Sequence, residues 1–214
     1  MEEPVEQELK QEFQLERMIF FSDAVFAIAI TILALELKVP AIDRHIATDA
    51  MLLNSLDELI PKFVGFFISF FIIGLYWTIH HRMFGYVVRY NKRLLWLNLI
   101  FLLAIVLMPF STAFYSEYVI ELLRVPMMVY ATNIVFLGLM NIILWRYLTQ
   151  SKNGLTEGVR ADDRKYYLFR AMVVPVLFVS IAVIYLFNPK VAIFLPMFVP
   201  VVLRLAKRFV LKRK

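Results

Sequence analysis

The sequence predicts an all-α, polytopic membrane protein with six transmembrane helices. Of its 214 residues, 61% are hydrophobic, whereas soluble globular domains have about 45–50% apolar residues. The apolar residues fall in long runs, most of them long enough to cross a bilayer, rather than at amphipathic spacing. Both observations fit a helical membrane protein with a single domain.

Composition and motifs also limit the chemistry. There is no cysteine, which excludes a disulfide framework and a thiolate metal site. No phosphate-binding glycine loop, T-V-G-Y-G filter or H-E-x-x-H motif occurs. Ser22 has no recognisable base to activate it, and the adjacent His80 and His81 cannot share one helix face. We therefore expect no enzyme, no cofactor, no metal site and no nucleic-acid partner.

Residues 1–16 are expected to form a cytoplasmic N-terminal segment. They are rich in glutamate, where a signal peptide would be basic. Val5, Leu9 and Phe13 repeat at four-residue spacing, which indicates a short helix with a weak apolar stripe. We expect this segment to be a frayed tail or a membrane-surface helix, or else to contact another subunit.

Six apolar runs follow, and Pro40 ends the first. Pro61 suits the start of the second, in which Gly65, Ser69 and Gly74 permit close helix approach. A kink is expected at Pro175 in the fifth. The predicted helices span about residues 18–37, 61–80, 94–110, 125–147, 167–187 and 191–205.

The sixth run is short, holds two prolines, and taken alone is compatible with a re-entrant segment. Charge favours a span. With six spans, eighteen of the 23 lysines and arginines share one side with both termini, and five lie opposite. The positive-inside rule then places both termini in the cytoplasm. Residues 17–206 form the six-helix transmembrane domain, and 207–214 form a basic cytoplasmic tail.

The first membrane helix carries a regular stripe on one face. At 100° per residue, the stripe consists of Ile28, Thr31, Ile32 and Leu35. Asp23 lies about 140° away from Ile28 around the same helix. The stripe therefore faces a different partner from Asp23: a pore, lipid or a neighbouring helix.

A polar cluster is expected near the cytoplasmic ends of the first three helices. Ser22 and Asp23 lie slightly more than a turn into the first helix. A charged side chain costs roughly 2.5–3.5 kcal/mol at the bilayer centre, so a membrane helix that keeps an aspartate usually buries it against protein or water. His80 ends the second helix, and Asn98 lies one turn into the third. Because these positions have similar depth, we expect the four side chains to meet and hold the first helix in place.

The first helix also resembles a known signature. Its residues Arg17-x-x-x-Phe21-Ser22-Asp23 resemble the R-x-x-x-F-S-D signature of the transmembrane protein 175 family, endolysosomal potassium channels and their prokaryotic relatives. The similarity continues to Leu37 and recurs in Tyr76-Trp77-x-x-His80-His81, Leu97-Asn98-Leu99 and Met108-Pro109-Phe110. Six helices resemble the single-repeat prokaryotic form.

The resemblance implies a potassium-permeable cation channel without a carbonyl filter, in which four chains surround one pore lined by the first helix. The family's constriction position falls on Ile28, and its further pore-lining positions fall on Thr31, Ile32 and Leu35. The motif residues form a structural network: Arg17, Phe21, Ser22, Asp23, His80 and Asn98. The implied partners are three further copies, the bilayer, and K⁺ or other monovalent cations.

A ring of isoleucines offers ions no ligands, so we expect gating by dewetting and modest selectivity for K⁺ over Na⁺. Thr31 hydroxyls offer partial oxygen ligation. The outer connection is acidic and either concentrates cations at the pore mouth or is an ordinary solvated loop. Its acidic residues are Asp43, Asp49, Asp57 and Glu58.

Two other functions remain open at this stage. A proton-coupled secondary transporter would use Asp23 as its titrating group, but transporters of this kind have broken helices at the midplane. The first helix contains no Gly or Pro between Met18 and Leu37, which counts against that function. A membrane assembly or scaffold protein would carry no ion at all.

Overall fold

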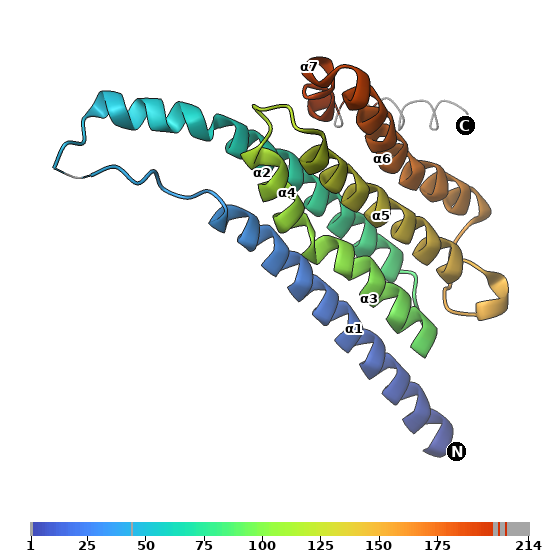
Figure 1. The fold of residues 1–214 in the computed structure, drawn as a ribbon. Helices are drawn as coiled ribbons and strands as arrows, with labels where there is room; N and C mark the ends of the chain where they lie inside the picture. The colour runs from blue at the N-terminus through green and yellow to red at the C-terminus, as the bar shows by residue number, and fades with distance from the viewer. Residues whose placement is uncertain (1, 44, 199–200, 202–203, 205–214) are drawn as a thin grey trace.

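In the computed structural model, residues 2–43, 45–198, 201 and 204 are described, and they form a helical bundle (Figure 1). The long helices are α1 (Glu2–Leu35), α2 (Asp49–Phe84), α3 (Lys92–Val106), α4 (Met108–Glu117), α5 (Arg124–Leu148) and α6 (Ala161–Phe187). The short elements are η1 (Ser151–Asn153), α7 (Pro189–Ala192) and η2 (Leu195–Phe198). The described residues contain no strand, only one isolated bridge between Val87 and Thr156.

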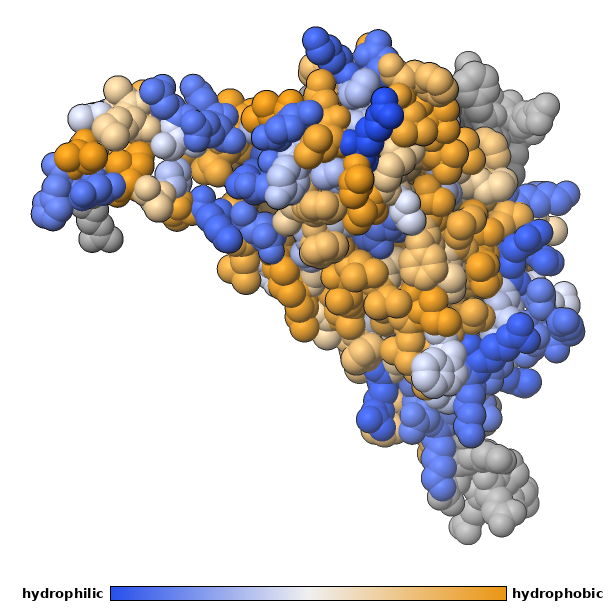
Figure 2. Space-filling view, in the orientation of Figure 1, coloured by the Kyte–Doolittle hydropathy of each residue, from blue (hydrophilic) through white to orange (hydrophobic). Residues whose placement is uncertain are grey.

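Five helical segments of the described chain are long and apolar enough to cross a membrane, with α3 and α4 counted as one. Figure 2 shows an apolar band across the bundle, with hydrophilic residues gathered towards both ends. The prediction of an all-α, multi-pass membrane protein is confirmed. The sixth predicted helix begins in the region of α7 and η2, and most of its second half, with the tail 207–214, lies outside the described residues.

The start of α2 differs from the prediction. The helix begins at Asp49, not at Pro61, and continues through Pro61. Thr48 caps it, because its hydroxyl oxygen accepts a hydrogen bond from the Met51 backbone N–H (3.3 Å). The four-residue spacing of Leu56 and Ile60 is that of one helix face, which also favours a helix before Pro61. Of the acidic residues that suggested a loop, Asp49, Asp57 and Glu58 belong to this helix, and Asp43 precedes it.

Helix α2 also ends later than predicted, at Phe84 rather than at His80, and two further helix starts differ. Helix α1 runs without interruption from Glu2 to Leu35, so the expected N-terminal helix is the first part of the membrane helix. Helix α6 begins at Ala161, with Asp162 and Asp163 in its first turn. Carboxylates stabilise a helix N-terminus through its dipole, which explains the earlier start.

The third predicted helix is divided at Leu107 into α3 and α4. Pro109 has no N–H and so interrupts the helical hydrogen bonds there. The side chain of Asn133 on α5 bridges the division: its amide lies 3.2 Å from the carbonyl of Ala104 and 3.2 Å from Ser111 Oγ. A buried side chain thus satisfies the polar groups that the break leaves in an apolar environment.

Helix α1 lies at one edge of the bundle and α6 at the opposite edge (Figure 1). Helix α5 packs against α3, α4 and α6, while α1 packs against α2, α3 and α4. The core between them is rich in large, fully buried side chains: Phe26, Ile73, Tyr76, Leu94, Phe101, Tyr130, Trp145, Phe178 and Tyr185. Among the described residues, none packs against one side of α1.

Gly138 permits the close approach of α5 to α6. A Cβ added there would lie 2.7 Å from the ring of Pro175, a rigid group that cannot move aside by changing rotamer. Gly74 on α2 provides the contrast, because an added Cβ would have no neighbour within 4 Å. Small residues at such crossings let membrane helices pack closely.

We expect Gly138→Ala to lower the free energy of unfolding by about 1–3 kcal/mol, because the added methyl overpacks the α5–α6 contact. Gly74→Ala is the matched control, with an expected gain of about 0.5–1 kcal/mol from helix propensity. Denaturant titration in mixed micelles measures both. Equal effects of the two substitutions would contradict the close contact.

Candidate pore helix and its polar anchor

Helix α1 has one buried face and one free face. The buried residues recur every three or four positions: Leu15, Met18, Ser22, Phe26, Ala29 and Leu33. They pack against α2, α3 and α4, all on the same side of α1. The opposite side of the helix has no neighbour among the described residues.

All four stripe residues lie on this free face. Ile28 is 57% exposed and Leu35 is 75% exposed, and Thr31 and Ile32 are also exposed. The Thr31 hydroxyl donates to the backbone carbonyl of Ile28 (2.8 Å). Its oxygen keeps lone pairs that can accept a hydrogen bond or contact a cation. Within one copy, the stripe is therefore an apolar surface with a single kind of oxygen ligand.

Behind the stripe, three buried polar side chains connect α1, α2 and α3; we call Ser22, His80 and Asn98 the polar anchor. The Asn98 side-chain amide donates to Ser22 Oγ (2.8 Å), and Ser22 Oγ donates to the carbonyl of Met18 (2.8 Å). His80 Nε2 lies 2.9 Å from Asn98 Oδ1. All three are fully buried. The structure thus brings together three of the four residues expected to meet.

The directions of these hydrogen bonds follow from one another. The single hydroxyl proton of Ser22 goes to Met18, so Ser22 Oγ accepts from the Asn98 N–H. The Asn98 carbonyl oxygen then faces His80, and Nε2 of His80 must carry the proton that this oxygen accepts. The network therefore fixes both the orientation of the amide and a proton on Nε2.

Aromatic rings enclose the histidine. The His80 ring stacks on Phe84, with centroids 4.1 Å apart, and on Phe101, with centroids 5.6 Å apart. Phe26 of α1 approaches it at 5.6 Å. The anchor is thus sealed in an apolar shell, where an unpaired polar group costs about 1–3 kcal/mol.

Asp23 is not part of the anchor, contrary to our expectation. Its carboxylate accepts a hydrogen bond from the indole N–H of Trp77 (2.9 Å), a second and more exposed link between α1 and α2. The turn of the helix explains the difference, because consecutive residues point about 100° apart. Arg17 and Phe21 are both exposed: the Arg17 guanidinium lies 5.7 Å from the ring centre of Phe13, and Phe21 is on the free face.

A second polar cluster went unpredicted. Thr112 on α4 donates to Ser69 Oγ on α2 (2.7 Å), and Ser69 Oγ lies 2.9 Å from the Tyr130 hydroxyl on α5. Ser69 was interpreted only as a small residue. Polar residues that interrupt apolar runs on three different helices were the available signal, but the sequence does not show which of them meet.

No group of three His, Cys, Asp or Glu side chains in the described part of the chain is arranged to hold a metal ion. What the geometry offers is a helix with a free apolar face, held from behind by two sets of hydrogen bonds. That arrangement suits assembly of several copies around the first helix.

Comparison with known proteins identifies the class and then the family. The family model described as "Endosomal/lysosomal potassium channel TMEM175" matches residues 17–109. A potassium channel of Chamaesiphon minutus is 36% identical over 151 residues, which cover 70% of this chain and 73% of that protein. A potassium channel of Streptomyces collinus is 38% identical over 133 residues, covering 61% and 63%.

The fold agrees. The crystal structure of a lysosomal potassium-selective channel TMEM175 homolog from Chamaesiphon minutus superimposes with a TM-score of 0.72 at 28% identity, covering 93% of this chain and 97% of that one. The class is therefore that of multi-pass helical membrane proteins related to ion channels. The chain belongs to the TMEM175 family. More distantly, the "Endosomal/lysosomal proton channel TMEM175" of Gallus gallus is 34% identical over 115 residues, covering 51% of this chain and 23% of that protein.

We expect Asn98→Leu to lower the free energy of unfolding by about 1–3 kcal/mol, because it leaves the His80 N–H without an acceptor in an apolar site. Asn141 on α5 is the matched control: it is also buried, and its amide has no hydrogen-bond partner among the described residues. Asn141→Leu should therefore be neutral or stabilising. Denaturant titration of both variants in mixed micelles measures the two free energies of unfolding. An equal decrease for both variants would contradict the stabilising role of the polar anchor.

Proposed function

We propose that the chain is a potassium-permeable cation channel in which four copies surround one pore lined by α1. The observation that carries the proposal is the free face of α1, a continuous stripe opposite a buried and hydrogen-bonded face. One copy has only one such stripe, so a closed pore needs several copies around an axis. The relatives named potassium channels support the choice of ion.

The wall of this pore offers side chains rather than backbone carbonyls. Helix α1 is uninterrupted from Glu2 to Leu35, so the carbonyls along the stripe are engaged in helical hydrogen bonds. In the proposed channel Ile28 forms the constriction, and Thr31, Ile32 and Leu35 line the following turns. The apolar ring closes by dewetting, and partly hydrated K⁺ passes in preference to more strongly hydrated Na⁺, with modest selectivity.

In this proposal the cell membrane is the site of action, with both termini in the cytoplasm, and the permeant species are K⁺ and other monovalent cations. No cofactor is required. The polar anchor and the Asp23–Trp77 bond hold α1, and Asp23 is off the conduction path. The acidic residues before and within the first turns of α2 lie near the outer mouth, where they raise the local cation concentration.

Proton permeation is the second candidate, because the animal relatives from Gallus gallus, Danio rerio and Bos taurus are named proton channels. A proton-coupled transporter that uses Asp23 is less well supported, since α1 is continuous and Asp23 already accepts a hydrogen bond. Flux of K⁺, Na⁺ and H⁺ into proteoliposomes, together with single-channel recording, separates these functions. Unitary K⁺ currents support the channel, and slow flux that requires a pH gradient supports the transporter.

We expect Ile28→Asn to change single-channel conductance or the K⁺/Na⁺ permeability ratio several-fold, because an amide ring hydrates a constriction that isoleucine keeps dry. Val183→Asn is the control, an apolar and exposed position on α6 at the far edge of the bundle. It should leave both quantities unchanged. If Ile28→Asn also changes neither, Ile28 does not line the constriction.

We expect Asp23→Ala and Trp77→Phe to have the same effect, since each removes one partner of a single hydrogen bond. In membrane proteins such bonds contribute about 0.6 kcal/mol on average, so both variants should unfold or dissociate slightly more easily. A double variant no worse than either single variant would confirm the coupling. An Asp23→Ala channel that unfolds and dissociates at the same denaturant concentration as the unsubstituted protein would refute the structural role of Asp23.

A further inference from the structure

The first turns of α2 extend beyond the rest of the bundle. The charge distribution predicts that this segment lies on the non-cytoplasmic side of the membrane. We therefore call residues 49–60 the outer arm. Helix α2 has 36 residues, or about 54 Å at 1.5 Å per residue, whereas the hydrocarbon core of a bilayer is about 30 Å thick. Figure 1 shows the arm at the upper left, extending away from the other helices at an angle to the rest of α2.

The outer arm is amphipathic. Four of its exposed large apolar residues share one side of the helix, while Met51 lies on the other: Leu52, Leu53, Leu56 and Ile60. Leu53 is 63% exposed and Ile60 is 54% exposed. The other side carries Asn54, Asp57 and Glu58. Exposed apolar surface is unfavourable in water by about 25 cal/mol per Å², and no part of the described chain covers this stripe.

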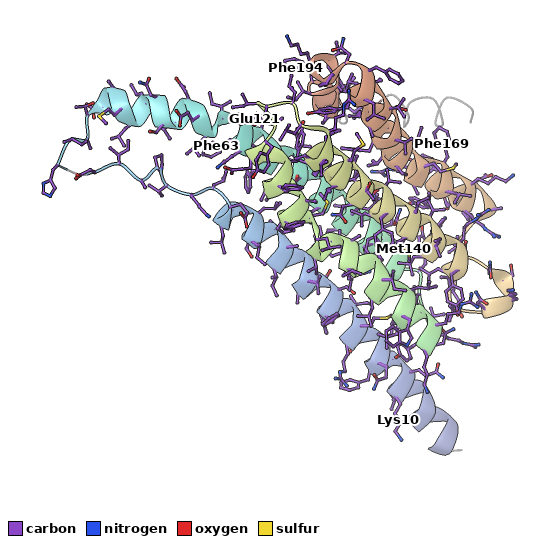
Figure 3. All side chains as sticks on the ribbon, in the orientation of Figure 1. Lys10, Phe63, Glu121, Met140, Phe169 and Phe194 are labelled. Carbon is purple, nitrogen blue, oxygen red and sulfur yellow. The ribbon has the colours of Figure 1, made fainter. Side chains whose placement is uncertain are left out.

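The arm stripe is continuous with the side of α2 that adjoins α1. Phe63 lies where the arm joins the bundle (Figure 3). Phe63 and Phe67 are both exposed, and the helix turn places them in line with the same stripe. Trp77, which bonds to Asp23 of α1, points only about 40° from Phe63 around the helix at 100° per residue. The apolar stripe of the outer arm therefore lies next to the edge of the bundle at which α1 exposes its free face.

The base of the arm is tied to the bundle. Lys62 Nζ, next to the arm, lies 2.7 Å from the carboxylate of Glu117 on α4. The chain stays helical through Pro61, so the arm and the membrane-spanning part belong to one helix. Helices that lie on membranes carry lysine and arginine on their polar face. Residues 46–61 contain neither and include three carboxylates, which disfavours a lipid surface as the partner.

We propose that the outer arm packs its apolar stripe against a second copy of this chain, so that the arms form a collar at the outer end of the assembly. This inference rests on the proposed α1-centred oligomer and adds a second contact to it. Lipid can cover an apolar face of α1 inside the hydrocarbon region, but not a stripe beyond it. The outer arm therefore makes assembly favourable independently of the pore helix.

Leu53→Glu tests the collar, with Asn54→Glu as the control. Both positions are exposed within one copy, and they point about 100° apart around the helix. Size-exclusion chromatography with light scattering gives the mass in detergent. We expect Leu53→Glu to shift the main species from the oligomer to smaller forms, with loss of K⁺ flux in proteoliposomes, while Asn54→Glu keeps both. Equal assembly of the two variants would overturn the collar.

Cross-linking separates failure of the collar from failure of the pore. The chain has no cysteine, so a bis-maleimide can join copies only at introduced sites: Leu35→Cys on α1, Leu53→Cys on the arm and Asn54→Cys as control. We expect covalent oligomers from the first two and few from the third. Cross-linking at Leu35 but not at Leu53 overturns the collar and leaves the pore. Absence of both, with no flux, refutes the oligomeric channel itself.

A membrane partner for the arm gives a different result. A fluorophore attached at Leu53→Cys would then be quenched by nitroxide-labelled lipids, and the cysteine would not cross-link. This outcome overturns the collar. Fluorescence that lipid nitroxides do not quench, together with cross-linking, supports it.

Discussion

The orientation of the Asn98 amide between Ser22 and His80 is the constraint on which the rest of this structure depends. Each side chain of the anchor is hydrogen-bonded to another member, and phenylalanine rings pack around the histidine. A shift of α1 by one residue would turn Ser22 about 100° away from Asn98. The anchor therefore selects one rotation and one depth for α1, at a cost of about 1–3 kcal/mol for each group left unpaired.

Once that rotation is set, the free face of α1 follows from helix geometry. Ile28 lies six residues after Ser22, about 120° from it on the helix at 100° per residue. The same rotation brings Asp23 beside the indole of Trp77 instead of into the anchor. The one carboxylate between Arg17 and Leu35 is thus used in a contact between helices. The face left for another molecule is apolar apart from the Thr31 hydroxyl.

The sequence predicted the structure correctly where a single physical rule determines it. Hydropathy predicted the membrane bundle, and counting depth along three helices predicted that Ser22, His80 and Asn98 meet. It failed where tertiary contacts override local signals. Pro61 has the features of a helix start, yet the Thr48 cap and the helical spacing of the leucines carry α2 past it. Pro109 accounts for the division at Leu107, but the bridging of that break by Asn133 and the Ser69–Thr112–Tyr130 cluster both depend on side chains from α5, which no local pattern specifies.

The two exposed apolar regions of the chain pose different physical problems. Inside the bilayer, lipid tails are as apolar as leucine, so the α1 stripe gains little hydrophobic free energy when copies associate. Packing and the exclusion of lipid from an axis must then hold the helices together. Beyond the hydrocarbon region the ordinary hydrophobic effect operates, and the leucines of the outer arm gain from burial at about 25 cal/mol per Å². In the proposed assembly, the strength of association therefore comes from the arm outside the membrane. The α1 contacts can then stay weak enough for a pore helix to move between closed and conducting arrangements.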